Sequence, residues 1–379
     1  MLRFTEEQNM VRDALSRHLA NRIVPRVEAE RHDEQFPVER LREVLSELGQ
    51  FGVGQARVSV SAGGMGLDNV TAGLIHETTA QQLHEVASPA LINESVGMLL
   101  DRIGTPQINQ RYLAPLLEGK LIAASANTES YGGSNIAAIQ TRARACAGGY
   151  RISGRKLWIT NGHFADFVLV LARSEDSGKP DFYLVDRHEH GFDARPQKVA
   201  GHTTVAELAF DEVEVPEGNR LTSGKDGLKN IFGAFHITRA FVALSACGIA
   251  RAAFDMALAF AADRSPFGKP IAGAQLVQAQ LADCEVELEA ARLLAYQALQ
   301  LADAGEPFDH AASLAKLYAS EMVQRVTARA CQIHGALGLS DEMPVARLKA
   351  AAQIFPIVEG ASEVQRLIIG RTLTGINGF

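Results

Sequence analysis

Glu359 has a sequence context that would suit a catalytic base. Glu359 follows four apolar residues, 355–358, and precedes a glycine. Removal from water raises the pKa of a carboxyl group and makes its carboxylate a stronger base, so this setting suits proton abstraction. Taken alone, Glu359 would be an ordinary acidic residue near a helix start, where it interacts favourably with the helix dipole.

Three further features suit a ligand that carries a planar ring and phosphates. Trp158, the only tryptophan, lies two residues before Thr160 at the end of an alternating segment, which could supply a flat wall and a hydroxyl. Thr128 and Ser134 lie in a loop of small residues, where the main chain can approach a ligand closely. Arg264 carries a fork of donors that can bind two phosphate oxygens at once. A core tryptophan, a plain turn and a helix-end ion pair are the ordinary interpretations of these residues.

Four motifs, in this order, resemble those of the acyl-CoA dehydrogenase family. Residues 127–135, NTESYGGSN, are similar to T-E-P-x-A-G-S-D, and residues 154–161, GRKLWITN, to G-x-K-x-W-I-T-N. Residues 264–275, RSPFGKPIAGAQ, match R-x-x-F-G-x-x-I-x-x-x-Q. Residues 332–338, QIHGALG, and 358–366, VEGASEVQR, are similar to Q-I-x-G-G-x-G and Y-E-G-T-S-E-I-Q-R. Each motif alone is weak, but the four together resemble the family over essentially the whole chain.

The resemblance implies an FAD-dependent α,β-dehydrogenation of an acyl thioester to the trans-2-enoyl thioester. Glu359 matches the base that removes the α-proton, and the flavin accepts the hydride from the β-carbon. The thioester oxygen would be held by the Glu359 main-chain N–H and a ribityl hydroxyl of the flavin. Some family members carry the base just before an arginine on a bundle helix. Here Thr238 precedes Arg239, and a hydroxyl cannot do this work, which favours Glu359.

The resemblance also assigns binding residues and an assembly. It implies substrate contacts at Ser134, Arg239 and Gly360, and no metal ligands. In the family, the arginine equivalent to Arg264 and the loop at 332–336 reach the flavin of a neighbouring subunit. We therefore expect non-covalent FAD in a homo-oligomer, a tetramer or at least a dimer. The FAD contacts implied are Thr128, Ser134, Trp158, Thr160, Arg264, Phe267, Gln275, Gln332, Gly335, Ala336, Ala361 and Glu363.

The partners implied are an acyl-CoA or acyl-carrier-protein substrate and an electron-transfer flavoprotein or similar acceptor. Several residues depart from the family motifs: Ser130 replaces Pro, Asn135 Asp, Ala336 Gly, Val358 Tyr and Ala361 Thr. They suggest a divergent branch, such as a biosynthetic enzyme that acts on a carrier-protein thioester, with a short or medium acyl chain. A flavin oxidase on the same fold and a catalytically silent scaffold or binding protein stay open as alternatives.

The elements that must position these residues follow the order helical, β, helical. Apolar residues recur at near four-residue steps over 5–117, short alternating runs fill 123–217, and Ala/Leu-rich helical segments follow. We predict an α+β fold of the acyl-CoA dehydrogenase type. Its parts are an N-terminal helical domain (1–120), a central antiparallel β domain of barrel or sandwich kind (121–225) and a C-terminal four-helix bundle (226–379). Residues 150–159 are predicted to turn at Gly154, as in a hairpin. No GxGxxG follows a strand, which excludes a Rossmann domain.

The composition excludes several classes of function. The net charge is −7, and no run of Lys or Arg would bind nucleic acid. The apolar stretches are too short and interrupted to cross a membrane. Acidic residues near the N-terminus oppose a signal or transit peptide, and the four cysteines lack disulfide or metal-ligand spacing. We expect a soluble cytoplasmic protein that binds neither nucleic acid nor membrane.

Overall fold

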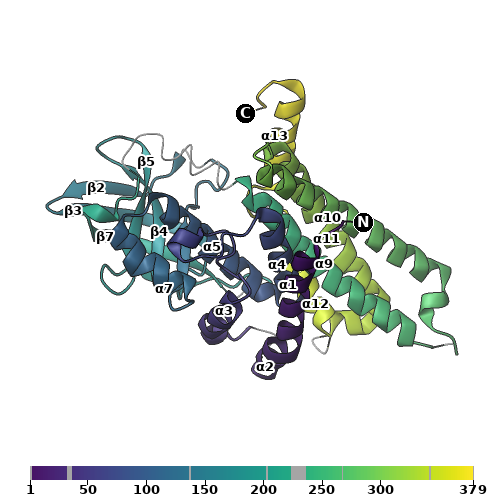
Figure 1. The fold of residues 1–379 in the computed structure, drawn as a ribbon. Coiled ribbons are helices and arrows are strands. Elements are labelled where there is room, and N and C mark those ends of the chain that lie inside the picture. The colour runs from purple at the N-terminus through teal and green to yellow at the C-terminus, as the bar shows by residue number, and fades with distance from the viewer. Residues whose placement is uncertain are drawn as a thin grey trace. The chain divides into compact units, whose positions relative to one another are not determined.

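The structure is a computed structural model that describes residues 2–31, 36–135, 138–201, 204–222, 236–266, 268–340 and 343–378. They form two compact units (Figure 1). One contains Met1–Phe36, Asn69–Ala87 and His236–Phe379, and the other Pro37–Asp68 and Ser88–Phe235. The chain order is helical, β, helical, as predicted. The N-terminal helices are divided between the two units, and the boundaries of three linear domains stay a prediction.

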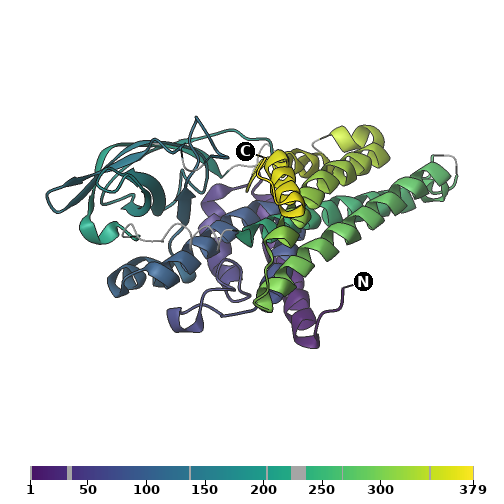
Figure 2. The same ribbon diagram turned by 90° about the horizontal axis from the view of Figure 1, so that it is seen from above.

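The second unit is built around a seven-stranded sheet. Its order is β1-β4-β2-β3-β7-β6, with β5 also paired to β4, and Figure 2 shows the strands curling round a common interior. The pairings are mostly antiparallel, as predicted, although β1 and β2 both run parallel to β4. The strands are β1 (Ala123–Ala126), β2 (Arg142–Cys146), β3 (Gly149–Thr160), β4 (Phe167–Ser174), β5 (Pro180–Asp186), β6 (Asp193–Pro196) and β7 (Val205–Pro216). The helices of this unit are α3 (Leu41–Gly49), most of α5 (His84–Ile103), α6 (Pro106–Ile108), a π turn (Asn109–Leu113) and α7 (Ala114–Leu117).

Period-two alternation in β4 divides the core of this unit in two. Phe167, Leu169 and Leu171 pack with the helices, in a cluster that includes Leu100. The alternate residues of the same strand pack in the interior of the sheet. Because both faces of β4 are buried, its sequence is apolar almost without interruption. The result is a fixed frame for β3, the strand that carries Trp158.

β3 is one continuous strand, so the predicted hairpin turn at Gly154 was wrong. Gly154 pairs with Phe210 of β7, and the ladder shifts register around it. A Cβ at Gly154 would lie only 2.4 Å from Thr141 Oγ1. Close approach of a neighbouring backbone therefore requires the glycine, which is the other common reason for glycine inside a strand.

The first unit is helical. Its long helices α9 (Thr238–Asp263), α10 (Gln275–Asp303) and α11 (Asp309–His334) run side by side (Figures 1 and 2), and α4 (Asn69–Gln82) packs against α9 and α10. The predicted helical C-terminal region is thus confirmed, and it takes in a helix from the N-terminal part. α1 (Glu6–His18), a π turn (Leu19–Ile23), α2 (Val24–Ala29), α12 (Pro344–Ala352) and α13 (Ser362–Thr374) complete the unit.

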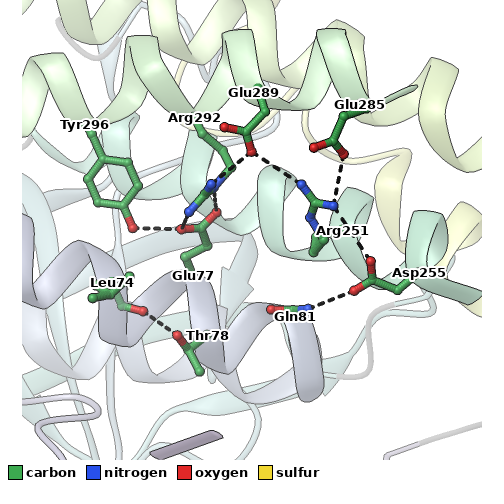
Figure 3. A network of polar contacts seen from close by, with 10 residues as sticks. All are labelled: Leu74, Glu77, Thr78, Gln81, Arg251, Asp255, Glu285, Glu289, Arg292 and Tyr296. Atoms are coloured by element: carbon green, nitrogen blue, oxygen red, sulfur yellow. Dashed lines mark hydrogen bonds and ion pairs between the residues drawn. The ribbon is translucent and has the colours of Figure 1, made fainter. Parts of the chain in front are cut away.

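A chain of ion pairs fixes α4 against its neighbours (Figure 3). Glu77 of α4 accepts hydrogen bonds from Arg292 Nε at 2.6 Å and from the Tyr296 hydroxyl at 2.7 Å. Arg292 continues to Glu289 at 3.0 Å, and Glu289 to Arg251 of α9 at 3.3 Å. Breaking a buried ion pair costs about 3–5 kcal/mol, because the remaining charge is left uncompensated. The network therefore favours one alignment of α4, α9 and α10.

The expectation that every apolar stretch is too short or interrupted to cross a membrane was wrong for α9, the one described helix long and apolar enough, with a hydropathy of 1.5 over its most apolar window. In the structure 78% of that window is buried inside the protein. Its neighbours are α4, α10 and α11. A helix that is apolar all round and covered by other helices is a core helix.

Candidate active site

Glu359 lies in the turn between α12 and α13. The turn is held against α11, where Lys316 Nζ donates to the main-chain oxygen of Gly360 at 2.7 Å. This contact brings Glu359 to the start of α9, where the Thr238 hydroxyl donates to Glu359 Oε2 at 3.1 Å. The position that carries the base in some family members is therefore a direct partner of the Glu359 carboxylate.

The backbone of this turn is strained. Glu359 has φ 51° and Gly360 has φ 92°, so both are left-handed. For a residue with a side chain this costs about 1–2 kcal/mol, and such strain gathers at functional sites. Gln365 Nε2 donates to the main-chain oxygens of Glu359 and Gly360 at 3.3 and 3.0 Å. The φ of 92° at Gly360 is one that residues with a side chain rarely adopt, and a Cβ there would also lie 2.5 Å from that nitrogen, so glycine suits this position.

The surroundings of Glu359 make it a stronger base than an ordinary glutamate. The residue is exposed at the surface of the turn, yet protein atoms gathered around the carboxyl group desolvate it in part. This desolvation raises the pKa of Glu359, against the opposing effects of the Thr238 hydrogen bond and the charges of Arg239 and Lys316. The predicted source of desolvation was partly wrong, since Ile357 is 70% exposed. Among the described residues no group accepts the Glu359 N–H, which leaves a donor for a substrate oxygen.

Arg239 faces the same turn from the start of α9. Its Nη1 lies 3.4 Å from Ser313 Oγ, and Asp309 and Glu359 are the acidic groups that act on it. Burial lowers the pKa of Arg239, and the two carboxylates oppose this shift. A guanidinium with one long hydrogen bond within the described part of the chain keeps donors for a ligand. This suits the predicted substrate contact.

Trp158 lies in a bulge of β3. The pairing of β3 with β7 shifts register between Lys156 and Ile159, and Trp158 takes a left-handed φ of 60°. A bulge of this kind turns a side chain away from its regular direction. The indole is 58% exposed, unlike that of a core tryptophan. The Trp158 main-chain N–H donates to Gln197 Oε1 at 3.2 Å, which helps to hold the bulge.

A buried ion pair, which the sequence analysis did not single out, fixes the loop beside Trp158. Lys156 Nζ and Glu129 Oε1 are 2.8 Å apart, and the Lys156 side chain is 0% exposed. Glu129 also accepts the main-chain N–H groups of Gln140 and Thr141. These donors hold the pKa of Glu129 below its usual value despite burial. Lys156 and Glu129 both belong to the motifs quoted above. The sequence signal for this pair was a charged residue, Lys156, at a strand position that faces inward.

This pair brings the predicted β-domain residues together. The main-chain oxygen of Thr128 accepts from the Leu157 N–H at 2.9 Å, so Thr128 lies beside the Trp158 bulge. Thr160 is half-buried in the last position of β3, and Ser134 is exposed. Asn161, with φ 66°, then ends the strand.

Five of the predicted FAD residues lie at the end of the long helices that is opposite to Glu359. Arg239 contacts Ser313 at the starts of α9 and α11, and Phe260 stacks on His334 near their ends, with ring centroids 4.6 Å apart. The two helices are therefore parallel, and each has 26 residues. At 1.5 Å per residue their two ends are about 39 Å apart. The residues at the far end are Arg264, Gln275, Gln332, Gly335 and Ala336, all exposed.

Ala361 and Glu363 belong to the near end, beside Glu359. Ala361 is the N-cap of α13, and Glu363 lies in its first turn with a side chain 80% exposed. Phe267 lies outside the described residues.

These residues fit FAD. An exposed indole fixed by a bulge offers the flat wall that an isoalloxazine ring needs; Thr160 ends the same strand, and Thr128 lies beside it in the loop after β1. Arg264 is exposed at the C-terminal end of α9, where its guanidinium can reach a phosphate. The motifs predict FAD contacts at both residues, and those contacts stay a prediction.

Comparison with known proteins gives matches along the whole chain. Family models described as the acyl-CoA dehydrogenase N-terminal, middle and C-terminal domains match residues 5–120, 124–213 and 225–374. The probable acyl-CoA dehydrogenase YngJ of Bacillus subtilis is 34% identical, over 97% of this chain and 98% of that protein. The CarC subunit of the caffeyl-CoA reductase–Etf complex of Acetobacterium woodii is 32% identical, over 98% and 99%. The structure of glutaryl-CoA dehydrogenase from Mycobacterium smegmatis in complex with FADH2 superposes with a TM-score of 0.89 at 26% identity, covering 99% and 96%.

The fold and these matches define an FAD-dependent oxidoreductase that acts on the CH–CH bond of acyl thioesters. The chain belongs to the acyl-CoA dehydrogenase family.

Proposed function

We propose that this enzyme oxidises a saturated acyl thioester to the trans-2-enoyl thioester with Glu359 as the base. The α-proton passes to the Glu359 carboxylate, a double bond forms between the α- and β-carbons, and the β-hydrogen leaves with two electrons. FAD, when bound, supplies the acceptor for that hydride. The observation that carries the proposal is a carboxylate of raised pKa, held in a strained turn by partners from two helices.

Neighbouring groups support each part of this step. The Glu359 N–H would hold the thioester oxygen as enolate charge develops. Arg239 and Gly360 would contact the substrate, and the Thr238 hydroxyl keeps the carboxylate oriented through its 3.1 Å hydrogen bond. Trp158, Thr160, Thr128 and Ser134 would contact the flavin and thioester from the β domain.

An anaerobic titration with thioesters tests the proposal. We expect the absorbance of oxidised FAD to bleach when a short or medium acyl-CoA is added, because the flavin takes the hydride. A parallel series of acyl-carrier-protein thioesters decides the carrier. The motif departures, taken together, favour a carrier protein, whereas the names of the relatives favour CoA. Oxygen consumption without an added acceptor would instead support an oxidase, and no bleaching with any thioester would support a silent scaffold.

The electron acceptor is proposed to be an electron-transfer flavoprotein or a similar protein. The name of the Acetobacterium woodii relative includes such a complex. We also propose a cytoplasmic location, in keeping with four free cysteines of which three are buried.

Trp158 offers a direct test of the flavin wall because it is the only tryptophan. Adding FAD to the apoprotein should quench most of the tryptophan emission. Trp158→Ala should raise the Kd for FAD on the order of tenfold, since aromatic stacking contributes about 0.5–1.5 kcal/mol beyond the area that it buries. Fluorescence titration of the wild type and flavin titration of the variant measure the two effects. An unchanged Kd would remove Trp158 from the flavin site.

We further propose that a second copy of the chain completes the cofactor site. About 39 Å separate the two ends of the long helices, too far for Arg264 and Glu359 of one chain to serve one FAD. α10 carries exposed apolar side chains that suit contact with another copy: Leu276 at 81%, Val286 at 69% and Leu293 at 47% exposed. A homotetramer, or at least a dimer, follows from this proposal.

A further inference from the structure

One face of α11 holds the segment that carries Glu359. Its side chains donate to main-chain oxygens of that segment in order along the helix: Cys331 to Val345 at 3.7 Å, Gln324 to Ala352, Ser320 to Phe355 at 3.0 Å and Lys316 to Gly360 at 2.7 Å. Steps of seven, four and four residues keep the donors on one side of a helix. The last contact of the series is made to the residue next to Glu359.

Among the donors of this series, Lys316 has the highest free-energy cost of burial. Its side chain is fully buried, and burial lowers the pKa of its ammonium group to about 8. The charged groups that act on it are Glu359, Glu321 and Glu363, which favour the ammonium, and Arg239, which opposes it. A serine or glutamine, as used elsewhere in the series, would supply a donor at far lower desolvation cost. The charge of Lys316 therefore calls for a role beyond holding one carbonyl.

The hydrogen bond of Lys316 is made to a strained part of the backbone. Glu359 and Gly360 are both left-handed, and their main-chain oxygens are held by Gln365 and Lys316. Gln365 belongs to α13, so it moves with the turn that it supports. Lys316 belongs to the long helix α11, which is fixed independently of that turn.

We propose that Lys316 is a positioning residue for Glu359: it fixes the strained turn through the Gly360 oxygen, and its charge favours the ionised carboxylate. The inference rests on the proposed function of Glu359 as the base. In this role Lys316 affects the rate of flavin reduction without contacting the substrate.

The kinetic test compares Lys316→Met with Ser320→Ala. Ser320→Ala removes a donor of the same series one turn away, so it reports simple loosening of the segment. Lys316→Met should slow flavin reduction by about 10- to 100-fold, in keeping with the effect of a small misplacement of a catalytic group, while Ser320→Ala stays near the wild type and FAD affinity is unchanged in both. In a Glu359→Gln background Lys316→Met should slow reduction no further. Equal slowing in the two single variants, or an additional loss in that background, would overturn the proposal.

A measurement without substrate separates this inference from the proposed function. The carboxyl band of Glu359, assigned by its absence in Glu359→Gln, can be titrated by infrared difference spectroscopy. Lys316→Met should raise the pKa of Glu359, because a positive charge that favours the carboxylate is lost. Lys316→Gln, which keeps a donor but no charge, should do the same and serves if the methionine variant does not fold. If no thioester reduces the wild-type flavin, the proposed function fails, whereas an unshifted pKa in both variants overturns the role of Lys316.

Discussion

Glu359→Gln is expected to keep FAD bound while the rate of flavin reduction by substrate falls by about 10²- to 10⁴-fold or more. Glutamine fills the same space in the turn and can still accept the hydrogen bond from Thr238, so the site should stay folded. The amide cannot take up the α-proton, and the hydroxyl of Thr238 cannot replace it. Anaerobic stopped-flow absorbance of the flavin measures the rate, and the flavin-to-protein ratio measures retention.

The pH dependence of the same step gives an independent signature. Only the ionised carboxylate accepts a proton, so reduction of the wild-type enzyme should be slow at low pH and rise through the raised pKa of Glu359. The residual rate of Glu359→Gln should lack this rise. Glu363→Gln is the matched control, one helical turn on and 80% exposed. It should weaken flavin retention or assembly more than proton abstraction. A wild-type rate in Glu359→Gln would require another base.

The fold was predictable because periodicity and motif order agreed. The long Ala/Leu-rich segments predicted helices in the C-terminal region, where α9, α10 and α11 lie, since nothing in them competes with helix. Gly154 could not be interpreted in the same way. A glycine in an alternating run serves either a turn or a close approach, and only the neighbouring Thr141 backbone decides between them.

The residue types of the candidate site could be predicted from the sequence, but the contacts that hold these residues in place could not. The motifs named Glu359 and Trp158, yet the left-handed backbone at both depends on partners outside their own motifs: Lys316 for one turn, and the bulge against β7 for the other. Such partners lie far apart in the sequence and leave only a weak signal. In Lys316 that signal is a charge on a helix face whose other donors to the segment, Ser320, Gln324 and Cys331, carry none.

The separation of the predicted FAD residues into two groups also needed the structure. In sequence, Arg264 and Glu359 are simply two motif residues. In the helical unit, α9 and α11 run parallel, so that Arg264 and residues 332–336 share one end and Glu359 lies at the other. If these residues contact FAD as proposed, a single chain carries two partial sites, which a symmetric pair of chains can join.

Mixed oligomers of two defective variants are expected to recover activity that neither variant has alone. Arg264→Ala should weaken FAD binding by about 10- to 100-fold, since a charged hydrogen bond contributes about 1.5–3 kcal/mol, and so should be inactive at limiting FAD. Glu359→Gln lacks the base. If Arg264 serves the partner's flavin, each mixed pair contains one site with both Glu359 and Arg264 intact and one site with neither. If both residues serve the same chain, no site in the mixed pair is intact. Co-expression with two affinity tags isolates the mixed species, and flavin reduction at limiting FAD measures recovery.

The control replaces Glu359→Gln by the Glu359→Gln/Arg264→Ala double variant, which cannot supply the arginine and should give no recovery. Absence of recovery in the first mixture, with mixed oligomers present, would contradict a cofactor site shared between subunits.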